Sequence, residues 1–460
     1  MFSLASCDWI GFDLDHTLIR YRLKELHTLI YRLMSEYLVN FHEYNRRLLD
    51  IAYDEEFGVK ALIYDGLYGN LIQLDSNGLV HTAWHGTCRR LSPTEIKESY
   101  PNALEAIEED PSKRFLCIFT YFDHAISYLL GNLVDMIDQE NLYEECSTNR
   151  INFEGKFSFF LKDLRAGFDY LFGDFNRGNY FSTLRENPQG YVYPRPDVRC
   201  WLEKLKQSGK KLFLATNSRA DYTDLLNTFA FGKDWKDLFE VIIVDCKKPL
   251  FFTESNKQVF QRLTDDHQQS IPVTVEEMIE LFDTNPIYAF GNSDDLHSVM
   301  SRISEKDPVV IYFGDHIKSD INALKRHTNW LAGAVIEELE YDTPPTVIHT
   351  TTHHSSKELA ASEQAAYVKG NRSKYFASFF TSPAESIHFD CEDTAAETKM
   401  EQTDPDAVLP ALSSYWYTYI TKHAHLSLSC LSVLANHFDL DQEFHHDPQT
   451  EHFILMHQNK

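Results

Sequence analysis

Basic residues are scarce in this chain. Lysine and arginine together number 43 against 69 aspartates and glutamates, which gives a formal net charge of −26 over 460 residues. A field of this sign repels phosphate backbones, so we expect no nucleic-acid polymer among the partners. A small phosphorylated substrate is compatible with this charge, because a metal ion and a few local cations override the global field at short range.

Long apolar runs and paired cysteines are also missing. No uncharged apolar stretch reaches the ~18 residues that a membrane-spanning helix requires, so we expect no membrane partner. The eight cysteines are scattered and form no Cys-x-x-Cys pair, which favours a reduced intracellular protein. The first residues show neither a basic region nor an apolar region typical of a cleaved signal, and we predict a cytoplasmic protein.

The stretch that organises the sequence lies close to the N-terminus. Apolar Trp9, Ile10 and Phe12 predict a short buried strand, and Asp13 and Asp15 follow at its carboxyl end, where open α/β sheets bind ligands. Residues two apart in an extended segment point to the same side, so both carboxylates are candidates for contacting one phosphate and one metal ion. One would attack phosphorus and the other would handle the proton. The same pattern is also typical of a solvated turn.

Strands and helices alternate again after residue 194. Strands are predicted at 211–215, 239–244, 309–313 and 331–335, and helices at 196–209 and 221–229. Strands that alternate with helices pair in parallel through right-handed crossovers. We therefore predict an α/β fold, a doubly wound Rossmann-like parallel sheet.

A long insert separates the first strand from the rest of this core. Helical periodicity is clear from Leu26 to Leu38, the apolar segment 115–137 is predicted as a packed helix, and strands at 71–74 and 79–84 flank an Asn-Gly turn. A large, mainly helical insert placed after a catalytic strand is typical of a cap over the site, with a purely structural subdomain as the alternative.

The predicted organisation has five parts. They are the first strand and nucleophile loop of the core (1–20), the cap insert (21–193), the remainder of the core (194–340), a flexible linker or loop (341–372) and a C-terminal extension that packs on the core (373–460).

Polar side chains follow two more of the predicted strands. Thr216, Asn217 and Ser218 come after 211–215, where hydroxyl, amide and backbone N–H groups at a helix start receive phosphate oxygens well. The same three residues are also typical of an ordinary helix cap. Lys248 follows the next strand, although a lysine in a loop is usually just solvated.

Asp315 and Asp320 follow the predicted strand 309–313. Parallel strands bring their carboxyl ends to one edge of the sheet, so these stretches argue for a single site. Converging carboxylates repel by about 4 kcal/mol per pair at about 4 Å, which demands a cation. A hard divalent ion with oxygen ligands meets this demand and also binds phosphate, and Mg²⁺ is the candidate.

The ordered motifs Asp13-Leu14-Asp15-His16-Thr17, Thr216-Asn217-Ser218, Lys248 and Gly314-Asp315-His316-Ile317-Lys318-Ser319-Asp320 resemble those of the haloacid dehalogenase-like hydrolases. More narrowly, the sequence is similar to the cytosolic purine 5′-nucleotidase family, and within it to the 5′-nucleotidase domain-containing protein 1 branch. Similar segments outside the core are 64–71, 85–86 and 247–252. The resemblance is clear over roughly residues 5 to 340.

The resemblance implies catalytic roles. Asp13 would be the nucleophile that forms an aspartyl-phosphate, and Asp15 the acid that protonates the leaving oxygen and then activates water. Thr216 and Asn217 would hold the phosphoryl group, while Lys248 would neutralise charge on it and on Asp13.

The resemblance also implies a metal site. Mg²⁺ would be held by the carboxylate of Asp13, the backbone carbonyl of Asp15 and the carboxylate of Asp315, with Asp320 in support. Arg165 and Asp169 resemble residues of a cap helix that contact the substrate, although their spacing of four is equally that of a helix-surface ion pair. The pairs His353-His354 and His445-His446 suggest metal ligands, but their polar context favours solvated histidines.

These features favour a Mg²⁺-dependent phosphomonoester hydrolase, a 5′-nucleotidase that acts on nucleoside monophosphates through an aspartyl-phosphate. One alternative is a catalytically weak nucleotide-binding regulatory or interaction protein. Another is a phosphatase acting on another phosphorylated metabolite or protein. The expected partner is a small phosphorylated metabolite, and the sequence leaves a homo-oligomer open.

Overall fold

The computed structural model describes residues 2–110, 114–139, 142, 157–173, 178–253, 255–264, 269–284, 286–340, 373–376, 378–382, 412–444 and 453–454. The predicted linker 341–372 and the histidine pairs His353-His354 and His445-His446 lie outside these residues.

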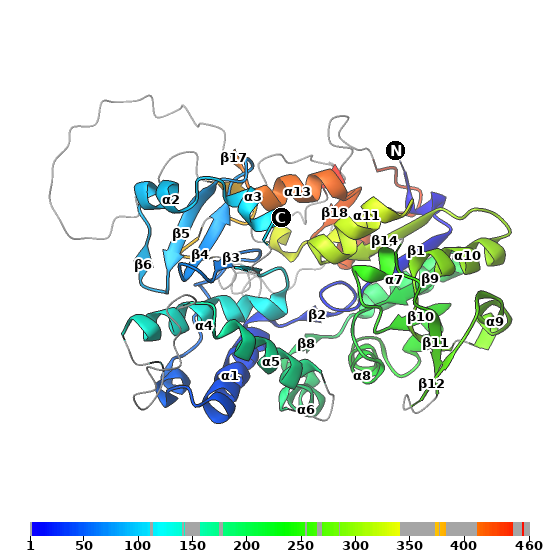
Figure 1. The fold of residues 1–460 in the computed structure, drawn as a ribbon. Coiled ribbons are helices and arrows are strands. Elements are labelled where there is room, and N and C mark those ends of the chain that lie inside the picture. The colour runs from blue at the N-terminus through cyan, green and yellow to red at the C-terminus, as the bar shows by residue number, and fades with distance from the viewer. Residues whose placement is uncertain are drawn as a thin grey trace.

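A ten-stranded sheet forms one half of the molecule, with strand order β12-β11-β13-β10-β9-β1-β14-β15-β18-β19 (Figure 1). Its strands are β1 (Trp9–Phe12), β9 (Lys211–Ala215), β10 (Val241–Val244), β11 (Phe260–Leu263), β12 (Ser270–Pro272), β13 (Ile287–Phe290), β14 (Val310–Gly314), β15 (Leu331–Val335), β18 (Leu426–Leu428) and β19 (Phe453–Ile454). All pairs from β13 to β19 are parallel, and β11 and β12 pair antiparallel at the other edge.

The predicted α/β fold with a parallel sheet is therefore confirmed. β1 lies between β9 and β14 and is buried along its whole length, as its apolar sequence requires. The predicted strands at 211–215 and 331–335 coincide with β9 and β15, and those at 239–244 and 309–313 differ from β10 and β14 only at their ends. Strands β11, β12 and β13, of three or four residues, were not predicted, because runs this short and, in β11 and β12, mixed in polarity carry little periodicity.

Helices connect the strands of this sheet. They are α7 (Pro196–Gln207), α8 (Ala220–Phe231), α9 (Val275–Glu280), α10 (Ser293–Ser304) and α11 (Ala323–His327), with α13 (Tyr415–His423) and α14 (Leu431–His437) from the C-terminal part. Helix α7 illustrates why they form. Pro196 occupies its first turn, where no N–H donor is needed, and Val198, Trp201, Leu202 and Leu205 form its buried face.

The insert begins and ends in a two-stranded ribbon. Strands β2 (Arg20–Tyr21) and β8 (Val192–Tyr193) pair antiparallel, so the chain leaves and re-enters the core at one place (Figure 1). Between them lie a five-stranded antiparallel sheet, ordered β6-β5-β4-β3-β7, and six α-helices of the described residues. The strands are β3 (Ile63–Asp65), β4 (Asn70–Leu74), β5 (Val80–His85), β6 (Arg89–Arg90) and β7 (Phe115–Cys117), and the helices are α1 (Leu23–His42), α2 (Pro93–Ser99), α3 (Ala103–Glu108), α4 (Tyr121–Asp138), α5 (Leu161–Phe172) and α6 (Tyr180–Glu186).

The structure refines two predictions within the insert. Strands β4 and β5 form the hairpin expected around the Asn-Gly turn. The helix predicted over 115–137 is shorter, because 115–117 form β7. The side chain of Thr120 accepts the N–H of Asp123, and this cap sets the start of α4.

Strand β18 pairs in parallel with β15, so residues far beyond 340 complete the main sheet. Strands β16 (Thr381–Ser382) and β17 (Leu412–Ser413) form a separate pair. The boundaries between the five predicted parts stay predictions. Among the described residues, no helix combines the length and the apolar character needed to cross a bilayer.

Candidate active site

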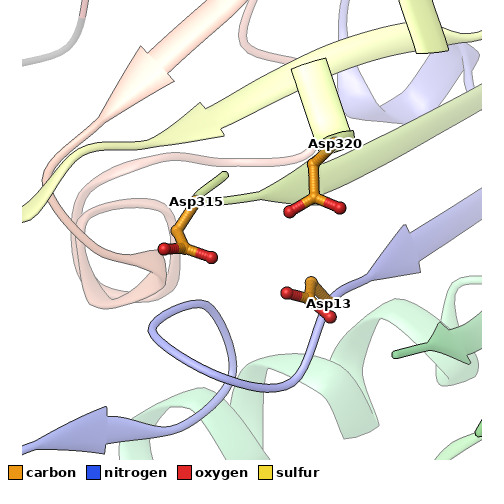
Figure 2. A group of neighbouring side chains, drawn as sticks. All are labelled: Asp13, Asp315 and Asp320. Atoms are coloured by element: carbon orange, nitrogen blue, oxygen red, sulfur yellow. The ribbon is translucent and has the colours of Figure 1, made fainter. Parts of the chain in front are cut away.

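Three aspartates meet at the carboxyl edge of the main sheet. Asp13 follows β1, Asp315 follows β14, and Asp320 lies in the π-helix η9 (Ile317–Asn322). One carboxylate oxygen of each lies within 4.8 Å of the others, and all three residues are buried. Figure 2 shows the three carboxylates facing a common centre. The topology therefore brings together acids that are up to 307 positions apart.

Local structure explains how Asp320 reaches this centre. A β-carbon added to Gly314 would lie 2.5 Å from the Cβ of Asp320, so only glycine lets η9 fold back over the end of β14. The turn is closed by hydrogen bonds. Oδ2 of Asp320 accepts the N–H of His316 at 3.1 Å, and the His316 ring accepts the N–H of Ser319 at 3.2 Å. Helices with this wider turn occur often at functional sites.

Lys248 lies between two of the aspartates. Its Nζ is 2.7 Å from Oδ1 of Asp13 and 2.8 Å from Oδ1 of Asp320. These anionic neighbours hold the pKa of Lys248 well above its usual range, although burial opposes them. Asn217 accepts the backbone N–H of Lys248 at 2.6 Å and donates to its carbonyl at 3.1 Å. The side chain of Asn217, predicted to hold phosphate, thus positions the loop that carries Lys248.

The insert contributes a second lysine that sequence reasoning missed. Nζ of Lys60 lies 3.9 Å from Oδ2 of Asp315, and its side chain is 1% exposed. The ammonium also lies 4.5 Å from the centre of the Tyr121 ring, at cation–π distance. The signal was a lone lysine within the apolar run Val59 to Leu62, because a buried ammonium requires an anionic or aromatic partner.

Burial is the largest influence on the pKa of Asp13, Asp15 and Asp315. It raises the pKa of Asp13 to about 6 against the opposing charge of Lys248, and it raises that of Asp15 to about 6 with help from Asp13. The pKa of Asp315 is well above its usual range for the same reason, although Lys60 lowers it. Anionic oxygens held this close fit a hard cation, so Asp13, Asp315 and Asp320 could bind a metal ion.

Asp15 lies beside this group and has different partners. The hydroxyl of Ser218 donates to its Oδ2 at 2.5 Å, and the phenol of Tyr21 donates to its Oδ1 at 2.5 Å. The neighbouring Thr216 is 1% exposed, and its hydroxyl oxygen accepts the N–H of Ser218 at 3.0 Å. Ser218 thus contacts Asp15 directly, and Thr216 contacts Ser218.

A cavity of about 300 Å³ opens onto these side chains. Its polar lining includes Asp13, Asp15, Thr216, Asn217, Ser218, Lys248, Asp315 and Asp320, together with Asp123 at the start of α4. Its aromatic wall is formed by Phe122, Phe168, Phe172, Phe181 and Tyr222. Four of these five rings come from insert helices α4, α5 and α6, so the insert supplies the apolar side of the cavity.

The structure does not bring Arg165 and Asp169 to this cavity. Both are exposed, and neither lines it. Phe168 and Phe172, on the same helix α5, line it instead. Residues 165, 168, 169 and 172 lie three or four positions apart and so share one side of α5. Within that side, the apolar pair Phe168 and Phe172 is the one turned toward the cavity.

Comparison with known proteins gives a consistent result. The sequence model of the 5′ nucleotidase family matches residues 1–409. The chain is 33% identical over 355 residues to 5′-nucleotidase domain-containing protein 1 of Homo sapiens, a match that covers 74% of each chain. It is also 33% identical over 358 residues to the protein of the same name from Bos taurus, again over 74% of each chain.

Proposed function

The chain belongs to the 5′ nucleotidase family, and from this membership we propose that it is a Mg²⁺-dependent phosphomonoester hydrolase acting on nucleoside monophosphates. The observation that carries the proposal is the convergence of Asp13, Asp315 and Asp320 in the lining of a cavity that Asp15 and Lys248 also line. A pure binding module has no need of two acids and a buried ammonium at one point.

The proposed reaction has two steps. A carboxylate oxygen of Asp13 attacks phosphorus, the bond to the leaving oxygen breaks, and Asp15 donates its proton to that oxygen. Water then attacks phosphorus and gives a proton to Asp15, while the bond between Asp13 and phosphorus breaks and releases inorganic phosphate. Lys248, 2.7 Å from Asp13, offsets negative charge in both steps.

The donor set supports Mg²⁺ as the metal. Asp13, Asp315 and Asp320 offer hard carboxylate oxygens, and the backbone carbonyl of Asp15 is the proposed fourth protein ligand. When bound, Mg²⁺ supplies positive charge that stabilises the phosphoryl oxygens. The two nearby ammonium groups face three carboxylates, which leaves a net negative site for the ion.

The aromatic wall supports a nucleoside as the leaving group. Aromatic rings such as those of Phe122 and Phe168, which line the cavity, can stack on a planar base. A sugar phosphate would instead require a wall rich in hydrogen-bonding groups. The cavity, about 300 Å³, is at the small end of the range for small-molecule sites and suits one mononucleotide.

The test is phosphate release from a panel of nucleoside monophosphates, sugar phosphates and p-nitrophenyl phosphate, with Mg²⁺ and with EDTA. We expect metal-dependent release with a preference for nucleoside monophosphates. Asp13→Asn should reduce turnover at least about 10³-fold and keep the wild-type unfolding temperature, because the nucleophile is lost while one repulsion between buried acids is relieved.

Asp439→Asn, which changes an exposed carboxylate, serves as the matched control and should keep full turnover. Release from none of the compounds by folded wild-type protein would favour a nucleotide-binding regulatory protein. Release confined to another metabolite would favour a phosphatase of different specificity. Wild-type turnover by Asp13→Asn would exclude Asp13 as the nucleophile.

A further inference from the structure

Three buried tyrosines form a line of hydrogen bonds that ends at Asp15. The phenol of Tyr21 lies 2.5 Å from Oδ1 of Asp15, the phenols of Tyr21 and Tyr222 are 2.9 Å apart, and those of Tyr222 and Tyr180 are 3.0 Å apart. Tyr21 and Tyr180 are fully buried, and Tyr222 is 5% exposed. We refer to Tyr180, Tyr222 and Tyr21 as the tyrosine chain.

The hydrogen bonds of the tyrosine chain can be donated in one direction only, toward Asp15. Each phenol has one proton. Because Tyr21 donates its proton to the Asp15 carboxylate, its oxygen must accept from Tyr222, and the oxygen of Tyr222 must in turn accept from Tyr180. Burial raises the pKa of all three phenols, so they stay protonated donors at neutral pH.

The tyrosine chain joins three separate parts of the fold. Tyr21 lies in β2 of the ribbon where the insert begins, Tyr222 in α8 of the core, and Tyr180 in α6 of the insert. The rings themselves are held by packing, since Tyr21 contacts His16 at 4.7 Å and Tyr180 contacts Phe172 at 4.6 Å between ring centres. The hydroxyl positions therefore depend on how the insert sits on the core.

We propose that the tyrosine chain is a positioning device that orients the Asp15 carboxyl group toward the leaving oxygen and couples its orientation to the docking of the insert. This inference rests on the proposed function, because the tyrosine chain has this role only if Asp15 is the catalytic acid. Ser218 fixes one oxygen of Asp15 and Tyr21 fixes the other, so the plane of the carboxyl group is set. Without the Tyr21 hydroxyl, that plane is free to turn.

Leaving-group dependence distinguishes positioning of an acid from general damage. The 5′-oxygen of a nucleoside needs a proton to leave, whereas p-nitrophenolate leaves without one. In Tyr21→Phe we expect kcat/KM to fall about 10- to 100-fold for the preferred nucleoside monophosphate, the size of a lost hydrogen bond to a charged group. For p-nitrophenyl phosphate, kcat/KM should fall less than about threefold. Calorimetric Mg²⁺ affinity should stay at the wild-type value.

A double-mutant cycle tests whether Tyr222 and Tyr21 act together as a tyrosine chain. Tyr222→Phe alone should lower kcat/KM for the nucleotide by a smaller factor than Tyr21→Phe. Tyr222→Phe keeps the ring that lines the cavity, and the hydroxyl that it removes reaches Asp15 only through Tyr21. The double variant should therefore be no worse than Tyr21→Phe alone. Tyr288→Phe is the control, since Tyr288 is buried in β13 and its hydroxyl has no hydrogen-bond partner among the residues that the structure describes. It should match the wild type.

Equal losses on both substrates in Tyr21→Phe, or additive losses in the double variant, would overturn the inference while leaving the proposed function intact. So would wild-type kinetics in Tyr21→Phe. Wild-type protein that is folded yet inactive on every compound would overturn the proposed function and this inference together. Unfolding temperatures within a few degrees of the wild type would show that the phenylalanine variants are folded.

Discussion

Two lysines from different parts of the sequence offset the negative charge of Asp13, Asp315 and Asp320. Lys248 belongs to the core and contacts Asp13 and Asp320, whereas Lys60 belongs to the insert and faces Asp315. Only Lys248 lines the cavity. Lys60 is therefore placed to act on Asp315 through its charge, without lining the cavity itself.

The charge of Lys60 should weaken the binding of a metal ion at the three aspartates. A cation bound among the three aspartates would be repelled by the Lys60 ammonium, so Lys60→Met should bind Mg²⁺ at least about tenfold more tightly than the wild type. Isothermal titration calorimetry at low ionic strength measures this directly. Lys60→Arg keeps the charge and should bind Mg²⁺ as the wild type does.

Lys257→Met is the control for loss of a positive charge, because Lys257 is 78% exposed and its pair with Asp294 is 4.0 Å long. Surface pairs of this kind contribute little, so no change in Mg²⁺ affinity is expected. Unchanged or weaker Mg²⁺ binding by Lys60→Met would show that Lys60 does not act on the metal site.

At the scale of elements, helices α1 and α4 of the insert pack through a pair of histidines. The rings of His27 and His124 stack with centres 4.6 Å apart and planes 14° apart. Burial lowers the pKa of His124 to about 4, and burial together with His124 lowers that of His27 well below its usual range. Both residues are therefore neutral in the folded protein at neutral pH.

This stack predicts acid sensitivity of the fold. Below pH ~6.5 the histidines of the unfolded chain bind protons, while His124 in the folded chain stays neutral down to about pH 4. The stabilisation is thus fully present above pH ~6.5 and is lost progressively as the pH falls toward 4. For His124 alone, the loss between pH 6.5 and pH 5 is about 2 kcal/mol.

His124→Phe keeps an aromatic ring and removes the titration. Its free energy of unfolding, measured in urea at pH 7.5 and pH 5.0, should fall by about 2 kcal/mol less than that of the wild type. The same substitution at His327, which is exposed, should leave the pH dependence unchanged. Equal pH dependence in wild type and His124→Phe would contradict this account of the stack.

At the scale of the whole molecule, the C-terminal part is built into the core. Strand β18 extends the main sheet beside β15, and α14 packs against α7, where Ser432 accepts from Arg195 and donates to Asp197. Trp416 of α13 donates to the carbonyl of Ala61, which lies in the insert. The C-terminal part thus contacts both halves of the molecule.

This arrangement predicts that a destabilising substitution in α14 also lowers the activity of the candidate site. Leu434 is fully buried in α14, and an aspartate there buries an unpaired charge, so Leu434→Asp should lower the free energy of unfolding by more than about 4 kcal/mol and abolish turnover at 37 °C. Asn436→Asp, on the exposed side of the same helix, should change neither. Retained turnover in Leu434→Asp, with loss of only the C-terminal structure, would show that the C-terminal part is independent.

Much of the fold could be predicted, because it follows from local patterns of apolar and polar residues. Apolar strands followed by polar residues alternate with amphipathic helices, and parallel pairing then brings the strand ends to one edge. Asp13, Thr216, Lys248 and Asp315 were expected at one site on this argument alone, and the structure places all four around one cavity. The three-residue strands β12 and β18 escaped prediction because so short a run has no measurable period.

The sequence by itself determined the fold class, the family and the residues at the strand ends, because each of these depends on periodicity and order along the chain. Only the tertiary structure decided how the insert meets the core. The contact of Lys60 with Asp315, the tyrosine chain and the aromatic wall join residues far apart in sequence. Whether Phe168 or its neighbour Arg165 reaches the cavity depends on how α5 is rotated against it. Such contacts follow from the docking of two packed bodies, and no local pattern encodes that docking.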